Sequence, residues 1–247
     1  MKSPQFLTDA QFQEMFPVLE CVPLSDVTQL RTRMTERRYK KQAVLMEKGE
    51  CGKLVLFMAG GCIKVMARGE CDKATVISFC ARGELLGEIN ALTPGGHSAD
   101  VIAEEPCFAW GLPVEDFLSC LAVMPRLSLN ISRLLAQRMR KATQQLHQLA
   151  SASAEQRVAY NLSAITERIN PAEAASVAAP SAVKKLPQGV DLSISVADLS
   201  SMSGCSREQV HRALRKLRDE ALIDRVEGGI RILHLAGLKE FYREKMN

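Results

Sequence analysis

The side chains with the clearest chemistry lie on one stretch, residues 204–217, and most of the charged ones are basic. Arg207, Glu208 and Arg212 can each bond to a base: arginine donates two hydrogen bonds to guanine O6 and N7, and glutamate accepts one from cytosine N4. Steps of one and five residues place the three side chains on one face of a helix. From residue 206 to residue 218 there are five basic residues and one acidic residue. Basic groups in the first helical turns oppose the helix dipole, so the pattern indicates contact with nucleic acid rather than stability alone.

The elements that must position these side chains are a turn and a helix. Gly204 suits the left-handed residue between two helices, and Ser206 is a natural N-cap. Ser195-x-x-Asp198 fits a capping box that opens a shorter preceding helix. An apolar face repeats at i, i+4 and i+7 of the second helix, on Val210, Leu214 and Leu217. The sequence therefore predicts a helix-turn-helix whose second helix enters the DNA major groove.

A hairpin is expected directly after this helix. Gly228-Gly229 separates two short apolar runs, Leu222–Val226 and Ile230–Ile232, and a glycine pair between such runs is typical of a tight turn. This hairpin would be the wing of a winged helix. The alternative is an ordinary three-helix subdomain with a solvated basic face.

The stretch Gly204–Leu217 resembles the recognition helix of the Crp/Fnr transcription regulators. In that family an Arg-Glu pair and a second arginine four residues on read the half-site, and the resemblance assigns these roles to Arg207, Glu208 and Arg212. The position of His211 varies between family branches, being glycine or serine in the best-known ones, which leaves part of the half-site sequence open. The candidate DNA-binding residues are Ser206, Arg207, Glu208, His211, Arg212, Arg215 and Lys216.

Residues 41–113 have a different character. Strand-sized apolar runs end at glycines about every 8–12 residues, which is typical of an all-β roll or jelly roll. In order and spacing the runs resemble the cyclic-nucleotide-binding β-roll of the same family. We therefore expect an α+β chain with a helical lead-in over residues 1–40 and a β-roll effector-sensing domain over 1–124. A dimerisation helix over 125–153 and a winged helix-turn-helix domain over 154–247 would follow, the latter with a flexible proline- and alanine-rich insertion over 170–189.

The resemblance places the effector site on two loop segments. In the cyclic-nucleotide binders a glutamate after glycine takes the ribose hydroxyl, and an arginine before serine or alanine takes the phosphate. Gly87, Glu88 and Ser98 match, but His97 stands where arginine is expected, and histidine has neither the planar fork nor the constant charge of arginine. A cyclic nucleotide is therefore disfavoured, and plain loop polarity is the alternative reading of Glu88 and His97. Thr143 falls where a partner-subunit hydroxyl contacts the nucleotide base.

Cysteines are concentrated in the first half of the chain, where seven of the eight occur: Cys21, Cys51, Cys62, Cys71, Cys80, Cys107 and Cys120. The closely spaced N-terminal cysteines of the iron–sulfur branch of the family are absent, so no iron–sulfur cluster and no other metal site is expected. Cys51 and Cys71 lie in glycine-flanked turns and are the candidate redox thiols, whereas Cys62, Cys80 and Cys107 lie in strand runs and are expected in the core. Haem held by Cys, His97 or Met stays open, as does thiol chemistry. The effector is unknown.

The longest helical run opens at Pro125 and extends to about Ser153. Its apolar residues step by 4, 3, 4, 3, which is the a/d seam of a coiled coil. The expected dimer-interface residues are Leu135, Met139, Ala142, Leu146 and Leu149. The alternative is a helix packed on its own β-roll.

Composition excludes little. The net charge of +4 is too small to indicate nucleic acid by itself, and neither a span of about 18 apolar residues nor a signal peptide is visible, so a cytoplasmic location with reduced thiols is expected. We predict a homodimeric transcription regulator, not an enzyme, that binds double-stranded DNA at a palindromic operator, responds to a small-molecule or redox signal and contacts RNA polymerase but no membrane. Alternatives are a cyclic-nucleotide-binding signalling module without specific DNA readout and a thiol or haem redox sensor on the same fold.

Overall fold

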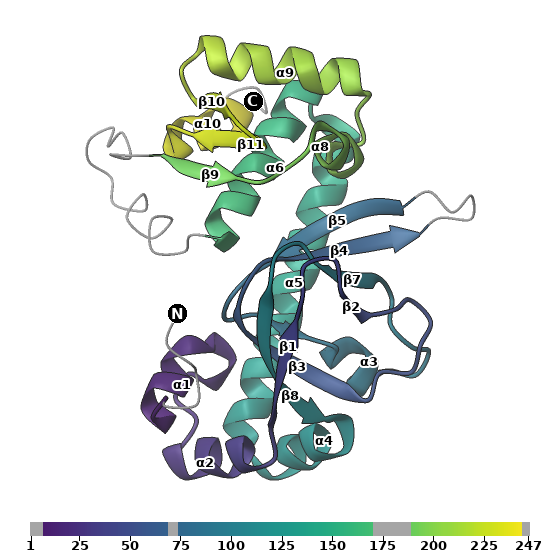
Figure 1. Ribbon diagram of the computed structural model, residues 1–247, viewed down its shortest axis with the longest axis vertical. Helices are drawn as coiled ribbons and strands as arrows, with labels where there is room; N and C mark the ends of the chain where they lie inside the picture. Colours follow the sequence, from purple (N-terminus) through teal and green to yellow (C-terminus); the bar gives the residue numbers. More distant parts are fainter. Residues whose placement is uncertain (1–6, 69–73, 170–188, 244–247) are drawn as a thin grey trace. The chain divides into compact units, whose positions relative to one another are not determined.

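The computed structural model describes residues 7–68, 74–169 and 189–243 of the 247-residue chain (Figure 1). The chain divides into two compact units, one of residues 1–74 and 79–141 and the other of residues 75–78 and 142–247. The later boundary falls inside the longest helix, α5 (Pro125–Ser151). Within the described ranges, no helix combines the length and the apolar character that a membrane crossing requires.

The strands between residues 35 and 113 form two four-stranded sheets, in agreement with the strand-sized runs of residues 41–113. One sheet has the order β1 (Thr35–Tyr39), β8 (Cys107–Pro113), β3 (Leu54–Gly60), β6 (Leu85–Leu86). The other has the order β2 (Val44–Met46), β7 (Asp100–Ala103), β4 (Ile63–Arg68), β5 (Ala74–Cys80). The short helix α3 (Glu88–Leu92) follows β6, and α4 (Val114–Val123) follows β8. The α+β fold class is confirmed.

Strand β3 shows why a continuous apolar run becomes a strand here. Successive side chains of a strand point to opposite faces, and β3 is buried on both. Val55 and Phe57 face a cluster formed with the helices, whereas Leu56 and Met58 face a second cluster between the sheets. The sequence of β3 is therefore continuously hydrophobic, because its alternate side chains pack into two different hydrophobic clusters.

Helices α1 (Asp9–Met15) and α2 (Leu24–Thr32), with a 3₁₀ turn at Pro17–Leu19 between them, confirm most of the helical lead-in. Phe16 packs edge-on to Phe57 of β3, with ring centroids 5.3 Å apart, and so fixes this segment to the sheet. The prediction is wrong at residues 35–39, which form β1 and pair antiparallel with β8. This segment, Thr-Glu-Arg-Arg-Tyr, carries no apolar alternation, and main-chain pairing to β8 decides its conformation.

After α5, the described residues of the second unit form four helices and a three-stranded sheet. The helices are α6 (Ala154–Ile169), α8 (Val196–Ser203), α9 (Arg207–Asp219) and α10 (Leu235–Arg243). The sheet has the order β10 (Ile223–Val226), β11 (Gly229–Ile232), β9 (Val190–Leu192). The predicted helix-turn-helix and its hairpin wing are present as α8, α9 and β10–β11 (Figure 1). The sequence reasoning did not foresee β9, and residues 170–188 of the expected insertion lie outside the described part of the chain.

Two glycines set the backbone of this unit. Gly204 adopts φ 57° and ψ 38°, the left-handed conformation expected between α8 and α9. Gly229 opens β11 where the strands β9 and β11 approach closely, and a Cβ at this position would lie 2.1 Å from the carbonyl oxygen of Leu192. Only glycine fits there without a shift of the backbone.

Candidate nucleic-acid interface and effector site

Helix α9 separates its residues into a buried and an exposed face. Val210, Ala213, Leu214 and Leu217 are buried. The exposed face carries Arg207, Glu208, His211, Arg212 and Arg215, so five of the seven predicted DNA-binding residues lie together on it. We call these five residues the exposed row; each of them has another member three or four residues away, the spacing at which side chains of a helix are neighbours.

Ser206 begins α9 as expected. Its hydroxyl oxygen accepts from the backbone N–H of Gln209 at 3.2 Å, and the Gln209 side chain accepts from the backbone N–H of Ser206 at 2.8 Å. This reciprocal capping box satisfies two otherwise unpaired donors and fixes where the exposed row begins. Gln209 was not predicted as the second member of the capping box, although a glutamine three residues after the N-cap is typical of this motif.

Lys216 is not part of the exposed row. Its ammonium group lies 3.4 Å from a carboxylate oxygen of Glu155 on α6 and 5.3 Å from the ring centroid of Phe241 on α10. Lys216 therefore contacts the two helices that support α9.

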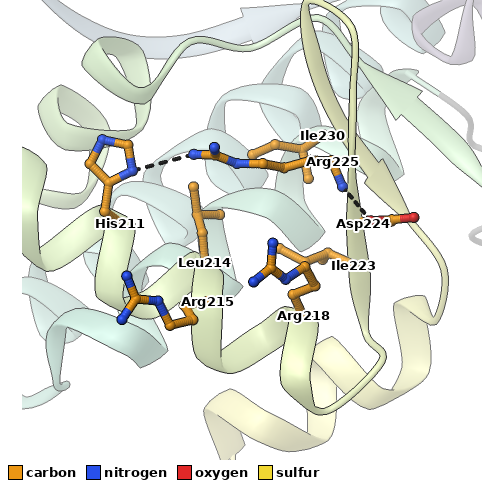
Figure 2. A pocket seen from close by; sticks show the side chains of 8 residues that line it. All are labelled: His211, Leu214, Arg215, Arg218, Ile223, Asp224, Arg225 and Ile230. Carbon is orange, nitrogen blue, oxygen red and sulfur yellow. Dashed lines mark hydrogen bonds between the residues drawn. The ribbon is translucent and has the colours of Figure 1, made fainter.

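A pocket opens between α9 and the wing, and Figure 2 shows its lining. Leu214 of α9 and the wing residues Ile223 and Ile230 are buried and hold the two elements together. The complete lining is His211, Leu214, Arg215, Arg218, Ile223, Asp224, Arg225 and Ile230. Three arginines and one histidine thus border one concave surface beside the exposed row.

One contact crosses this pocket. A guanidinium nitrogen, Nη2, of Arg225 on β10 lies 3.3 Å from Nδ1 of His211 on α9 (Figure 2). Sequence reasoning missed Arg225. The available signal is strand alternation: Arg225 is two residues after Ile223, so both side chains point to the same face of β10.

A second wing arginine is engaged elsewhere. Arg231 of β11 donates two hydrogen bonds to the Asp191 carboxylate of β9, at 2.6 and 2.8 Å. The hydrogen bonds from Arg231 lower the pKa of Asp191, and the same pairing raises the pKa of Arg231. This fork-like pair joins the edge strand to the hairpin.

The predicted effector residues are distributed over the fold. Gly87 is the left-handed N-cap of α3, and Glu88 follows it as a buried side chain that is 1 % exposed. Glu88 forms an ion pair with Arg138 of α5, whose other guanidinium nitrogen donates to the carbonyl oxygen of Leu85 at 2.6 Å. Burial raises the pKa of Glu88, and the Arg138 charge opposes that rise. Sequence reasoning placed Arg138 beside the seam and missed its role as the partner of Glu88.

His97 is held by the connection between β2 and β3. Its backbone N–H donates to Glu50 and its carbonyl oxygen accepts from Gly49, both at 2.9 Å. The ring packs so tightly over Gly52 that a Cβ there would lie 2.4 Å from His97 Cε1. Burial lowers the pKa of His97 below its ordinary value, and the Glu50 charge opposes this shift, so the neutral form of the ring is favoured. A neutral ring offers no charge to a phosphate.

The remaining predicted effector residues differ in their setting. Ser98 is exposed in the loop before β7. Thr143 is exposed on the part of α5 that belongs to the second unit.

The cysteines differ in exposure and acidity. Cys51 is exposed, as expected of a reactive thiol, whereas Cys71 lies outside the described residues. Cys107 is buried and Cys62 half-buried, and the Cys107 thiol donates to the Cys62 carbonyl oxygen at 3.3 Å. Burial raises the pKa of Cys62 to about 12 and that of Cys107 to about 11, and the nearby Glu105 adds to both shifts. These two thiols therefore stay protonated. Among the described residues, no group of three or more histidine, cysteine or acidic side chains is arranged to hold a metal ion.

The predicted helix from Pro125 is confirmed as α5, which ends at Ser151. Along its predicted seam, Met139 is 71 % exposed, Leu146 67 % and Leu149 46 %. Leu135 is half-buried and packs against the core of the first unit, and Ala142 is exposed. A row of exposed apolar residues on one helix is typical of a surface that a partner covers.

Comparison with known proteins matches both parts of the chain. Residues 36–123 match the family model of the cyclic nucleotide-binding domain, and residues 156–241 match that of the Crp-like helix-turn-helix domain. The chain belongs to the Crp/Fnr family of transcription regulators. It is therefore a DNA-binding regulator with an effector-binding domain, not an enzyme.

The relatives that match this Crp/Fnr protein are regulators. The cAMP-activated global transcriptional regulator CRP of Pasteurella multocida is 27 % identical over 187 residues, which are 75 % of this chain and 84 % of the relative. The cyclic AMP receptor protein of Thermus thermophilus is 27 % identical over 206 residues, 83 % of this chain and 86 % of the relative. The solved structure of FixK2 from Bradyrhizobium japonicum has a similar fold, with a TM-score of 0.68, 17 % identity and coverage of 84 % of this chain and 96 % of that one.

Proposed function

We propose that this protein is a homodimer that binds a palindromic operator through two copies of α9, with an affinity set by a signal in the β-roll. The observation that carries the proposal is the exposed row on α9, which combines four groups able to bond to base edges with a flanking arginine. In a two-fold dimer the two recognition helices meet successive major grooves about one helical turn apart, so the operator mirrors the symmetry of the protein. The proposal includes action in the cytoplasm and contact with RNA polymerase, and the membership of the family supports both.

The proposal divides the chain by role. Residues 1–124 sense the signal, residues 125–153 dimerise, and residues 154–247 bind DNA, with 170–189 as an insertion. In the exposed row, Arg207, Glu208 and Arg212 read bases and Arg215 contacts phosphate. The half-site then contains a G·C-bearing core similar to TGTGA or TTGAT.

His97 is evidence against one class of effector, the cyclic nucleotides. A cyclic nucleotide needs a cation for its phosphate, and His97, whose charged form burial disfavours and whose ring packs over Gly52, is a poorer partner than the arginine it replaces. Glu88, which would accept the ribose hydroxyl, is already paired with Arg138. We therefore favour an effector other than a cyclic nucleotide. Thiol chemistry at the exposed Cys51 and haem binding are the two alternatives that we retain.

Glu208 gives the sharpest test of base readout. A carboxylate near DNA is repelled by phosphate, so its presence in the row is justified by accepting a hydrogen bond from a base. We expect Glu208→Ala to lose about 1–3 kcal/mol of discrimination at one base pair of each half-site while non-specific binding holds or rises. The measurement is binding-site selection from a random DNA library, followed by titration of the selected sites at two salt concentrations.

The matched control is Glu220→Ala, which removes an exposed carboxylate just after the other end of the same helix. This variant should keep the wild-type selected sequence. If Glu208→Ala and Arg212→Ala both leave the preferred sequence unchanged, α9 docks on the DNA backbone and the assignment of base readers is wrong.

A further inference from the structure

The contact between Arg225 and His211 joins the wing to the exposed row of α9. Nη2 of Arg225 lies 3.3 Å from Nδ1 of His211, and both residues belong to the second unit. A guanidinium group donates hydrogen bonds and has no acceptor, so Nδ1 of His211 must be the acceptor. In a neutral imidazole the proton then resides on the other ring nitrogen, Nε2.

The second ring nitrogen points away from Arg225 in Figure 2. His211 is exposed and lies within the row, one helical turn after Arg207 and one turn before Arg215. Its Nε2–H is thus presented on the same face as the proposed base readers. The wing arginine fixes both which nitrogen carries the proton and the direction in which that proton points.

We propose that Arg225 is a positioning residue for base readout and that His211, held by it, is a specificity-determining donor. The proposal rests on the proposed binding of α9 in the major groove and adds the chemistry of one further base position. A single donor in the major groove pairs with an acceptor: guanine O6 or N7, adenine N7 or thymine O4. Cytosine presents the N4 amino donor at this edge, so cytosine is the base that His211 rejects.

The alternative role for Arg225 is a contact with backbone phosphate. The two roles have different signatures, because a phosphate contact weakens all sequences alike and lowers the salt dependence, whereas a base contact changes the preferred base. Arg218 provides the matched control. It lines the same pocket, and the described hydrogen bonds include none from Arg218 to His211.

Binding-site selection with three single variants and one double variant tests the proposal on the full-length protein. We expect His211→Ala and Arg225→Met to relax the rejection of cytosine at the same base pair by about 2- to 12-fold, the range that one hydrogen bond contributes. The double variant should relax it no further than His211→Ala alone, since both changes remove one interaction. Arg218→Met should lower affinity for all sequences and keep the base preference.

The tautomer of His211 gives a readout that does not need DNA. In protein labelled with ¹⁵N-histidine, long-range nitrogen–proton spectra distinguish the two neutral tautomers, and loss of one set of signals in His211→Gln assigns the residue. Wild-type protein and Arg218→Met should show the Nε2–H form for His211, and Arg225→Met should show a mixture of both forms.

The results distinguish failure of the role of Arg225 from failure of the proposed operator binding. If the wild type selects a palindrome but Arg225→Met and Arg218→Met behave alike, the proposed role of Arg225 is wrong and the operator proposal still holds. An Nδ1–H tautomer in the wild type overturns it as well. A wild-type protein that selects no palindrome at all removes the proposed function and the inference together.

Discussion

Two arginines in this protein each lie beside a titratable side chain. Arg138 faces the buried Glu88, and Arg225 faces His211 at the protein surface. Because a guanidinium group stays charged and only donates, each partner must act as an acceptor. The Arg138 charge thereby opposes the rise that burial causes in the pKa of Glu88, and in our proposal Arg225 selects one tautomer of His211.

Removing Arg138 should make the stability of the first unit depend strongly on pH. In Arg138→Ala the buried Glu88 loses the charge that offsets burial, so its pKa in the folded state rises further above the unfolded value. The folded state then binds the proton more tightly, and stability falls as pH rises through the folded pKa. Above that pKa we expect a loss of about 3 kcal/mol, the lower end of the cost of breaking a buried pair, since water reaches the 29 % exposed Arg138.

Urea unfolding of wild type and variant across the acid-to-neutral range measures this difference. Below about pH 4, the unfolded pKa, the difference should shrink to the pH-independent cost of the lost hydrogen bond to Leu85, because Glu88 is then protonated in both the folded and the unfolded state. The control Arg140→Ala, at an exposed position of the same helix, should follow the wild type. Adding Glu88→Gln to Arg138→Ala should remove the pH dependence, and a pH-independent loss in Arg138→Ala would contradict the argument.

At the scale of elements, α5 presents apolar side chains to solvent along one line. The five positions of the predicted seam cluster within a narrow arc of the helix, and three large apolar side chains on that arc are substantially exposed. A facing copy of the helix would cover them, as in a two-stranded coiled coil.

Leu146→Asp should separate the dimer. It places a carboxylate in the middle of the seam, and an unpaired buried charge costs several kcal/mol. Analytical ultracentrifugation at micromolar protein should show a dimer for the wild type and a monomer for the variant. Gln144→Asp, on the opposite side of the same helix, adds the same charge and should remain dimeric. A monomeric wild type would refute the seam.

Elements with strong local signals were predictable from the sequence. The capping residues Ser195 and Ser206, the turn at Gly204 and the apolar face of α9 all agree on the helix-turn-helix, and the structure confirms each. The strand β1 was not predictable in this way. Its charged residues give no periodicity, and it exists because β8 offers an edge to pair with.

The candidate sites follow the same division. The exposed row of α9 could be listed from one helical period, because its members lie close in sequence. The partners of Glu88 and His211 are 50 and 14 residues away in the sequence, so the period of a single helix does not predict them. Lys216 is the opposite case: its position in the sequence fits the basic face, but its ammonium group lies near Glu155 of α6 and Phe241 of α10, and its contact with DNA stays a prediction.

At the scale of the whole molecule, a regulator couples an effector site to a DNA site through a difference in free energy between states. An effector controls operator binding only if it binds the two states with different affinity. The coupling is reciprocal, so a ligand that raises the affinity for the operator must itself bind more tightly when the operator is present.

We expect cyclic AMP neither to bind this protein at low micromolar concentration nor to change its affinity for the operator. Because burial disfavours the charged form of His97 and its ring packs over Gly52, we expect calorimetry to show no binding at low micromolar ligand, with or without operator DNA. Operator affinity should stay the same when cyclic AMP is added. The control His97→Arg restores the residue that the phosphate needs, and a gain of cyclic AMP binding in it would support the argument. Tight binding to the wild type would show that another cation serves the phosphate.

The close approach at Gly229 has a consequence for genetics. Any other residue there would force its Cβ against the main chain of Leu192, so every missense allele of this codon disturbs the wing. A screen for regulatory mutants would recover such alleles together with those of the DNA-contacting codons, although glycine has no side chain with which to read a base. Genetic mapping alone would therefore overestimate the number of DNA-contacting residues. An immunoblot for protein abundance in each mutant distinguishes alleles that disrupt the wing from alleles that remove a DNA contact.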